Sequence, residues 1–329
     1  MSGTVTTTRA PISAPRLWIG IAISATCVYL VSQRIEWNAF AHALAGVSPI
    51  WLGAAALFNV AGAGCAGLRW RQVMVPDVVM PAREAFDVVV ISNLATVVAP
   101  SRAGDVAKAA LVSRRHAIPV SRVLGAMVVE RIADVLLVIL LAGGLSLVVP
   151  FPAVVRAGVS LFTIVGLGVI VAVLIAADWL PALAGRIVGL VAAPWGEKVR
   201  DFLSGIFDGV RRAGRIRRFP GTLAWSAANW ACSAAAVWCN LHAMSVAAPW
   251  YAALFVLLLV NLGGVIPASP GSIGVYHYLA VSALAVWMVD PSVALGFAVV
   301  AHATGIVVVT VLGLTGLASQ HESLFRVTA

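Results

Sequence analysis

The sequence predicts an all-α polytopic membrane protein, a bundle of about seven to nine transmembrane helices in one domain, residues 17–318. Of the 329 residues, 61% are hydrophobic and only 11% are charged, and the mean hydropathy is +0.99. A soluble domain is about 45–50% apolar and about 25% charged. The surplus of apolar side chains does not fit inside one globule, and the longest polar stretch, residues 178–221, is too short for a soluble catalytic domain.

The charge distribution supports the same class. The 22 Lys and Arg residues outnumber the 13 Asp and Glu residues, for a formal net charge of +9. Most Lys and Arg residues lie in short loops beside apolar stretches. By the positive-inside rule, such loops face the cytoplasm. We therefore expect a cell (inner) membrane protein with both termini in the cytoplasm, and no nucleic-acid partner. The four cysteines lie inside apolar stretches without a C-x-x-C pair, which predicts packing residues and no metal site.

The first apolar stretch, Leu17–Gln33, follows residues 1–16, which are rich in Ser and Thr and are expected to be disordered and cytoplasmic. A cleaved signal peptide is the alternative, but the absence of a clear small-x-small cleavage site favours a transmembrane helix. A cytoplasmic tail, residues 319–329, is expected at the other end. The later spans are expected at approximately Pro49–Leu68, Arg122–Val149, Ala157–Ala177, Thr222–His242, Trp250–Ile266, Val275–Val289 and Ser292–Ala318.

The stretch Ala85–Pro100 is short for a span and contains Asp87, Ser92 and Asn93. If it crossed the membrane, the cations that follow it would lie outside, against the positive-inside rule. A hairpin that enters from the cytoplasm and returns keeps those cations inside, so we expect a re-entrant element here.

Residues 195–216 carry apolar side chains at three- and four-residue steps, from Trp195 through Phe202 to Val210, which predicts an amphipathic helix. The cations lie largely off this stripe, so the helix is expected to lie flat on the cytoplasmic membrane surface. A plain positive-inside signal and specific binding of anionic lipid both remain open as explanations.

Two distant segments align without a gap, Asn93–Ala103 (NLATVVAPSRA) and Asn261–Gly271 (NLGGVIPASPG), with Asn, Leu, Val and Ser in common. After a shift of three residues, Ser121–Val129 aligns with Ser292–Val300. The loop charges give the helices that follow opposite directions. We therefore expect two inverted repeats, residues 49–149 and 222–318, an arrangement that recurs in secondary transporters.

Each repeat contains a helix break, the first break at Pro100–Gly104 and the second break at Pro267–Gly274. Proline and glycine interrupt helices, and the second break carries no charge, which indicates that it lies at membrane depth. The residues expected to act as hinges are Pro100, Gly104, Pro267, Pro270, Gly271 and Gly274.

Three ionisable residues, Glu130, Arg131 and Asp134, lie in an otherwise apolar span. Each charge costs about 2.5–3.5 kcal/mol to insert, so they are expected to face the protein interior or a wet cavity. Glu130 and Asp134 share a helix face, and Arg131 can pair with Asp134. A stabilising ion pair and a functional role, in head-group binding or proton coupling, remain open.

Other polar residues near the breaks complete the candidate substrate site. Arg102 and Lys108 suit a phosphate, although solvated cytoplasmic charge explains them equally well. His277 and His302 are more simply explained as hydrogen-bonded packing residues. The segment Leu68–Arg71 is expected to anchor its helix end at the membrane interface. The remaining candidates are Asn93, Ser101, Asp105, Asn261 and Ser269.

The segments Asn93–Asp105, Glu130–Asp134 and Ser269–Val275 together resemble the lysylphosphatidylglycerol synthase transmembrane-region family, flippase-like membrane proteins. The resemblance covers residues 17–318 and implies an integral inner-membrane protein that moves lipids or lipid-linked sugars between leaflets. Some members carry a soluble aminoacyl-transferase domain, which this chain does not contain. Such proteins usually have a glutamate where His277 stands, and losing that carboxylate would suit an anionic substrate.

The expected function is therefore transbilayer movement of an anionic phospholipid or a polyprenyl-phosphate-linked sugar, with membrane lipid as the partner. The sequence contains no Gly-x-Ser-x-Gly, P-loop or His-Glu-x-x-His motif, so no enzyme activity and no cofactor are predicted. The alternative is a non-catalytic partner of a membrane glycosyltransferase or envelope-assembly complex. A membrane-embedded transferase has the least support, and a homo-oligomer remains open.

Overall fold

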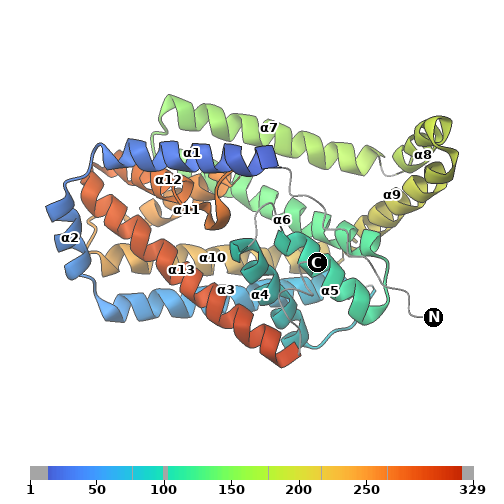
Figure 1. Ribbon diagram of the computed structural model, residues 1–329, viewed down its shortest axis with the longest axis horizontal. Helices are drawn as coiled ribbons and strands as arrows, with labels where there is room; N and C mark the ends of the chain where they lie inside the picture. Colours follow the sequence, from blue (N-terminus) through green and yellow to red (C-terminus); the bar gives the residue numbers. More distant parts are fainter. Residues whose placement is uncertain are drawn as a thin grey trace. The chain divides into compact units, whose positions relative to one another are not determined.

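The described residues of this computed structural model are 14–75, 77–98, 103–176, 178–215, 217–264 and 266–320, and they form helices joined by turns and loops, with no strand among them (Figure 1). This confirms the predicted all-α, polytopic membrane-type fold. The predicted disorder of residues 1–16 falls mostly outside these ranges, as does most of the predicted tail. The α-helices are α1 (Ala14–Ser32), α2 (Trp37–Ala45), α3 (Pro49–Met74), α4 (Ala82–Val98), α5 (Ala103–His116), α6 (Val120–Ser146), α7 (Ala153–Ala176), α8 (Leu180–Val191), α9 (Ala193–Ala213), α10 (Phe219–Ala243), α11 (Trp250–Gly263), α12 (Val275–Leu284) and α13 (Pro291–Gln320).

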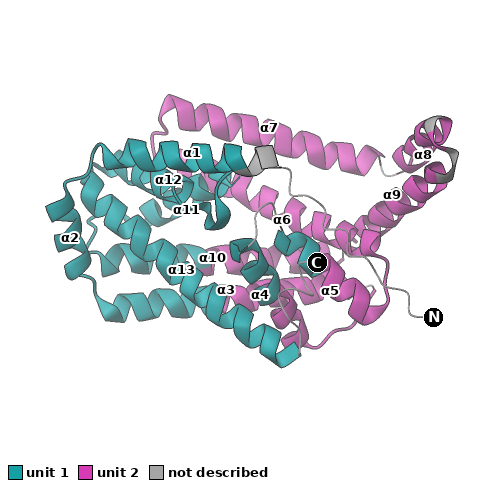
Figure 2. Ribbon diagram, in the orientation of Figure 1, with its two compact units in different colours: residues 1–60, 90–108, 233–329 teal, residues 61–89, 109–232 magenta. Residues whose placement is uncertain are grey.

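The chain forms two compact units, which are described separately (Figure 2). Unit 1 contains residues 1–60, 90–108 and 233–329. Unit 2 contains residues 61–89 and 109–232. The helices α3, α4, α5 and α10 each contribute residues to both units.

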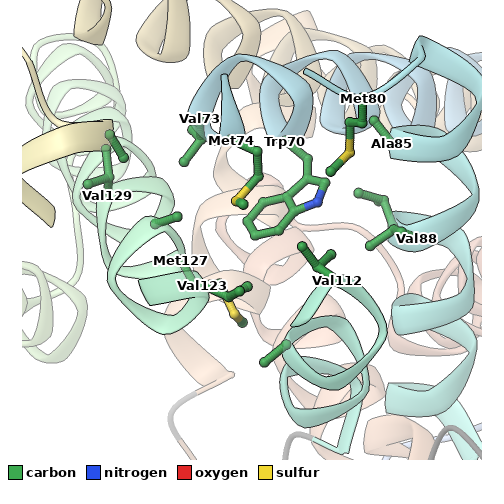
Figure 3. Close-up of a cluster of buried hydrophobic side chains, with 14 of the residues drawn as sticks. Trp70, Val73, Met74, Met80, Ala85, Val88, Val112, Val123, Met127 and Val129 are labelled. Carbon is green, nitrogen blue, oxygen red and sulfur yellow. The ribbon is translucent and has the colours of Figure 1, made fainter. Parts of the chain in front are cut away.

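Unit 2 has a hydrophobic core around Trp70, whose side chain is fully buried. Figure 3 shows the indole among Met74, Met80, Val88 and Val112, side chains that come from α3, from the segment before α4, from α4 and from α5. Residues of α6 and α9 complete this cluster. Burying apolar side chains of this size gives the unit a packed centre that positions the polar residues nearby.

The helix α9 packs tightly on α6 within unit 2. A Cβ on Gly125 or on Gly209 would collide with backbone atoms of the other helix, so this close crossing requires glycine. Phe207 and Val210, in the second half of the apolar stripe, are buried, whereas Trp195 and Phe202 are exposed. The expectation that the whole stripe lies on the membrane surface is therefore wrong for its second half, which the protein itself covers.

Unit 1 is built around α12, which packs against α1, α11 and α13. The short helix α2 packs against α13, and the backbone N–H of Glu36 donates to the hydroxyl of Ser292 at 3.0 Å. Gly313 of α13 lies against Leu94 of α4. These contacts surround the second break with helices.

Within the described ranges, three helices are long and apolar enough to cross a membrane, α3, α7 and α13, and α1 with α2 would make a fourth span that is bent by 94°. No residue of α7 is buried in the protein, as expected for a helix whose surface faces lipid. The helices α6 and α10 have 27 and 25 residues but are less uniformly apolar. The count of seven to nine spans stays a prediction.

The helix boundaries recur along the chain in the way that a repeat predicts. The starts of α4 and α11, Ala82 and Trp250, are 168 positions apart, as are the ends of α5 and α12, His116 and Leu284. The order α3-α4-α5-α6 can therefore be compared with α10-α11-α12-α13, but the repeat itself stays a prediction. The inverted orientation of the two halves stays a prediction.

Candidate functional site

The first break separates two short helices, α4 and α5, that form an antiparallel hairpin. Near the break, the Ser92 hydroxyl donates to the Gly104 carbonyl at 2.9 Å, and a Cβ on Gly104 would collide with Thr96 and the Ser92 carbonyl. At the other end, Glu84 lies 2.9 Å from His116 and 3.5 Å from Arg115. Both helices are shorter than the roughly 20 residues of a full span, as a re-entrant hairpin requires.

The predicted site residues of this hairpin have different surroundings. Pro100, Ser101 and Arg102 lie outside the described residues. Asn93 is exposed, Asp105 is half-buried and Lys108 is buried. Gly104 is the second residue of α5, and its role as a hinge stays a prediction. The absence of a side chain at this position allows α4 and α5 to approach each other.

The second break interrupts the chain between the end of α11 at Gly263 and the start of α12 at Val275. It contains one short 3-10 turn, Pro270–Ser272, and Gly271 and Gly274 have φ angles of 68° and 92°. A Cβ on Gly274 would lie 2.5 Å from the carbonyl oxygen of Ser24 in α1. Both the backbone angle and the close approach of α1 therefore require glycine at position 274.

Hydrogen bonds hold the second break against α1. The backbone N–H of Ser269 donates to the Ser24 hydroxyl at 2.9 Å, and the Ser269 hydroxyl donates to the Ile273 carbonyl at 3.0 Å. Asn261, by contrast, is exposed and donates to the Leu257 carbonyl of its own helix at 2.8 Å. Ser269 thus fixes the shape of the break, while the Asn261 side chain bonds within α11.

Two histidines lie together next to the second break. The ring centroids of His277 and His302 are 5.1 Å apart, and Tyr276 stacks on His302 at 4.5 Å. The backbone N–H of Gly274 donates to Nδ1 of His277 at 3.4 Å, and His302 makes a backbone hydrogen bond to Gly271. Both rings therefore contact the glycines of the break from helices α12 and α13.

The intramembrane charges of unit 2 form a network around Arg69 of α3. Its Nε donates to Oε1 of Glu130 at 3.1 Å, and its Nη1 donates to Oδ1 of Asp134 at 2.6 Å. Nη1 also donates to the hydroxyl of Ser226, at 3.0 Å, and the Trp230 indole N–H donates to Asp134 at 3.4 Å. We call these five residues, from α3, α6 and α10, the Arg69 network.

The Arg69 network is largely removed from solvent. The Arg69 and Glu130 side chains are 11% and 6% exposed, whereas Asp134 is 20% exposed. One guanidinium bonded to two carboxylates in this setting is a strong charge-assisted arrangement. The network can therefore hold ionised groups at a depth where isolated charges would not be stable.

The expectation that Leu68–Arg71 is an interface anchor is wrong. The helix α3 continues to Met74, so Arg69 and Trp70 are buried in the protein, and of the two arginines only Arg71 is exposed. Arg131 is exposed on α6, and the cation that contacts Glu130 and Asp134 is Arg69. Two carboxylates four residues apart in a span require a cation nearby, and that requirement was the signal for Arg69.

No group of three or more His, Cys, Asp or Glu that could hold a metal ion occurs among the described side chains. A comparison with the curated proteins found no match. Residues 17–313 match the protein family described as the lysylphosphatidylglycerol synthase TM region. This match covers most of the chain and agrees with the helical membrane-type fold. The chain therefore belongs to the lysylphosphatidylglycerol synthase TM-region family.

Proposed function

We propose that this protein moves an anionic lipid, either a phosphatidyl lipid or a lipid-linked sugar, between the leaflets of a bacterial-type inner membrane. The observation that carries the proposal is the Arg69 network, a buried set of ionised side chains on membrane-type helices. Ionisable residues inside membrane proteins usually mark a route or a site for a hydrophilic cargo. The family membership supports a membrane transporter-like role.

A lipid head group that crosses hydrocarbon must exchange its water for polar groups of the protein. The second break offers backbone polar groups at a point where α11 has ended and α12 has not begun. Broken helices supply such groups in secondary transporters. In this proposal the two breaks bend during transfer, and Arg102, Lys108 and Arg131 receive the phosphate.

Within the Arg69 network, the proposal assigns the two carboxylates different roles. Glu130 is the more deeply buried and holds Arg69 in place. Asp134 is the more exposed, and it already accepts from both Arg69 and Trp230. An arriving phosphate would compete with Asp134 for the Arg69 guanidinium, so Asp134 is the residue whose bonds change during transfer.

The direct test is leaflet transfer of fluorescent phosphatidylglycerol in proteoliposomes, compared between wild type and Arg131→Ala. We expect at least about a tenfold lower rate, the effect of losing one charge-assisted contact worth about 1.5–3 kcal/mol. Arg114→Ala is the matched control, because Arg114 is an exposed cation on α5. Undiminished transfer by Arg131→Ala would remove Arg131 from the mechanism, and absence of transfer in the wild type would reject the proposal for this lipid.

A second candidate function is supported by one feature of α9. Trp195 and Phe202 are 58% and 47% exposed, next to the basic residues of the same helix. A membrane glycosyltransferase or envelope-assembly protein that docks there would make this chain a non-catalytic partner. Purification from membranes of its own cells in mild detergent separates the candidates. A stable enzyme partner that is lost in Trp195→Ala/Phe202→Ala, together with no lipid transfer by the isolated chain, would favour docking.

A further inference from the structure

The helical segments around His277 and His302 are unusual because they carry no charged side chain. The helix α12 packs against α1, α11 and α13, and α1 from Trp18 onward, α11, α12 and α13 contain no Asp, Glu, Lys or Arg. The second break contains none either. The two imidazoles are therefore the groups in this region that can take up a proton as the medium becomes acidic.

The other titratable groups on the same elements do not change this. They are Cys27 and Tyr29 on α1, Tyr251 on α11, and Tyr276 and Tyr278 on α12. The ordinary pKa values of thiols and phenols lie above neutral pH, so acidification does not change the charge of such groups. Two acidic residues lie near the N-terminal end of α13. Asp290 accepts from the backbone N–H groups of Ser292 and Val293, and Glu36, before α2 with its His42, bonds to Ser292, about 15 Å along the helix from His302.

The contact between His277 and Gly274 depends on the protonation state of the ring. Nδ1 accepts the Gly274 N–H, which requires the neutral imidazole with its proton on Nε2. A second proton would go to Nδ1 and turn this acceptor into a donor that faces another donor. Protonation of His277 therefore removes a hydrogen bond that holds Gly274 in its φ of 92°.

The contact between the two rings limits the pair to one proton. With centroids 5.1 Å apart and no carboxylate on these helices, two imidazolium charges would repel each other without compensation. His302 is held by the stacked Tyr276 and by the Gly271 backbone. A proton on His277 thus acts on Gly274, one of the two positive-φ glycines of the second break, whereas the contact of His302 with Gly271 persists when His302 is protonated.

We propose that His277 and His302 form a proton-binding site that takes one proton at a time, and that a proton on His277 releases the second break from its hydrogen-bonded conformation. A role in lipid transfer rests on the proposed function, and release of the break does not. In the neutral state, the bonds of Ser24 to Ser269, His277 to Gly274 and His302 to Gly271 hold the segment together. The protonated state keeps only part of this set.

The test follows the mobility of a nitroxide spin label on Ile273, an exposed residue of the second break, in the full chain in vesicles with its four cysteines replaced by serine. We expect the mobile fraction to rise at least about twofold as the pH falls from about 7 to about 3.5, a range that extends below the usual imidazole titration because both rings are partly buried. A label on Val307, exposed on α13, should show no change.

His277→Gln is the decisive variant, because glutamine at the third position of a helix can accept the same backbone N–H but cannot take a proton. In this variant the label should stay immobile at every pH. His277→Ala should make it mobile at every pH. His242→Gln, at a histidine whose ring contacts Trp238 in the same unit, should leave the wild-type response unchanged.

A pH-independent label in the wild type, or a His277→Gln variant that still responds to pH, would overturn the proton site. Lipid transfer is measured on the same vesicles. If the label responds and transfer takes place with no dependence on pH, the site stands and its link to transport is rejected. If the label responds and no variant transfers lipid, the proposed function fails while the proton site is supported.

Discussion

The protein places polar groups among apolar helices in two different ways, one in each unit. In unit 2, the Arg69 network brings three ionised side chains together and balances charge with charge. In unit 1, the second break exposes backbone groups, and neutral hydroxyls and imidazoles satisfy them. The first arrangement cannot lose its arginine without leaving carboxylates that no longer have their bonded cation. The second depends on glycines and can change with one proton.

The largest expected effect is the loss of Arg69. Arg69→Leu leaves Glu130 and Asp134 without the guanidinium that bonds both, and breaking a buried pair in this way costs about 3–5 kcal/mol. The loss should lower the midpoint of thermal unfolding in detergent. Arg71→Leu is the matched control: its Nε donates to the Met80 carbonyl but the residue is exposed, so a much smaller shift is expected.

The triple variant Arg69→Leu/Glu130→Leu/Asp134→Leu separates stability from transport. Replacing a whole buried ion network by apolar residues is often neutral or stabilising, so the unfolding midpoint should recover relative to Arg69→Leu. Lipid transfer should remain abolished. A triple variant that is stable and still transfers lipid would assign the Arg69 network a purely structural role.

The next effect concerns the backbone of the second break. Gly274→Ala places a side chain at a φ of 92° and against the Ser24 carbonyl, a strain of about 1–3 kcal/mol. The variant should unfold at a lower temperature than the wild type. Gly305→Ala on α13 has no atom within 4 Å of its new Cβ and should unfold at the wild-type temperature or above it. Equal effects of the two variants would contradict the assigned strain.

A smaller effect is expected from the indole that bonds Asp134. Trp230→Phe keeps most of the ring and removes the N–H donor, whose distance to Oδ1 is 3.4 Å, so we expect a loss of about 0.5–1.5 kcal/mol. Chemical unfolding monitored by fluorescence measures it. Trp225→Phe, on the same helix, controls for the loss of a tryptophan, and a larger effect there would argue against the assignment.

The smallest effect lies at the ends of the α4–α5 hairpin. Glu84→Gln removes an ion pair with Arg115 and His116 that is partly exposed, which is worth about 0.2–1 kcal/mol. The difference from wild type should shrink in about 1 M salt, where exposed charges are screened. A difference that survives high salt would indicate that the carboxylate acts by packing.

Much of the fold was predictable because apolar stretches determine where membrane helices lie. The span predicted to start at Pro49 begins at the same residue as α3. The spans predicted to start at Trp250 and Val275 begin at the same residues as α11 and α12. The helices α2 and α8 were not predicted, since each is too short to produce a span-length apolar signal. The covered half of α9 could not be predicted from its own pattern, because an apolar stripe does not say whether lipid or protein covers it.

The candidate site was predicted in part. Glu130 and Asp134 were recognised because carboxylates in an apolar span are costly, but Arg69 was assigned to a helix end because the span was drawn six residues too short. The proximity of His277 and His302 results from tertiary packing between α12 and α13. No local pattern in the sequence contains that information, so the sequence predicted only that each histidine is a packing residue.

The bond between Ser24 and Ser269 joins residues that are 245 positions apart. During synthesis, α1 leaves the ribosome long before the second break has been made. The surface of α1 that contacts the break therefore has no binding segment until the last helices insert. A chain that stops after α10 would leave Gly20 and Ser24 without the segment that they contact. Correct assembly therefore requires the first helix to remain near the insertion site until translation is almost complete.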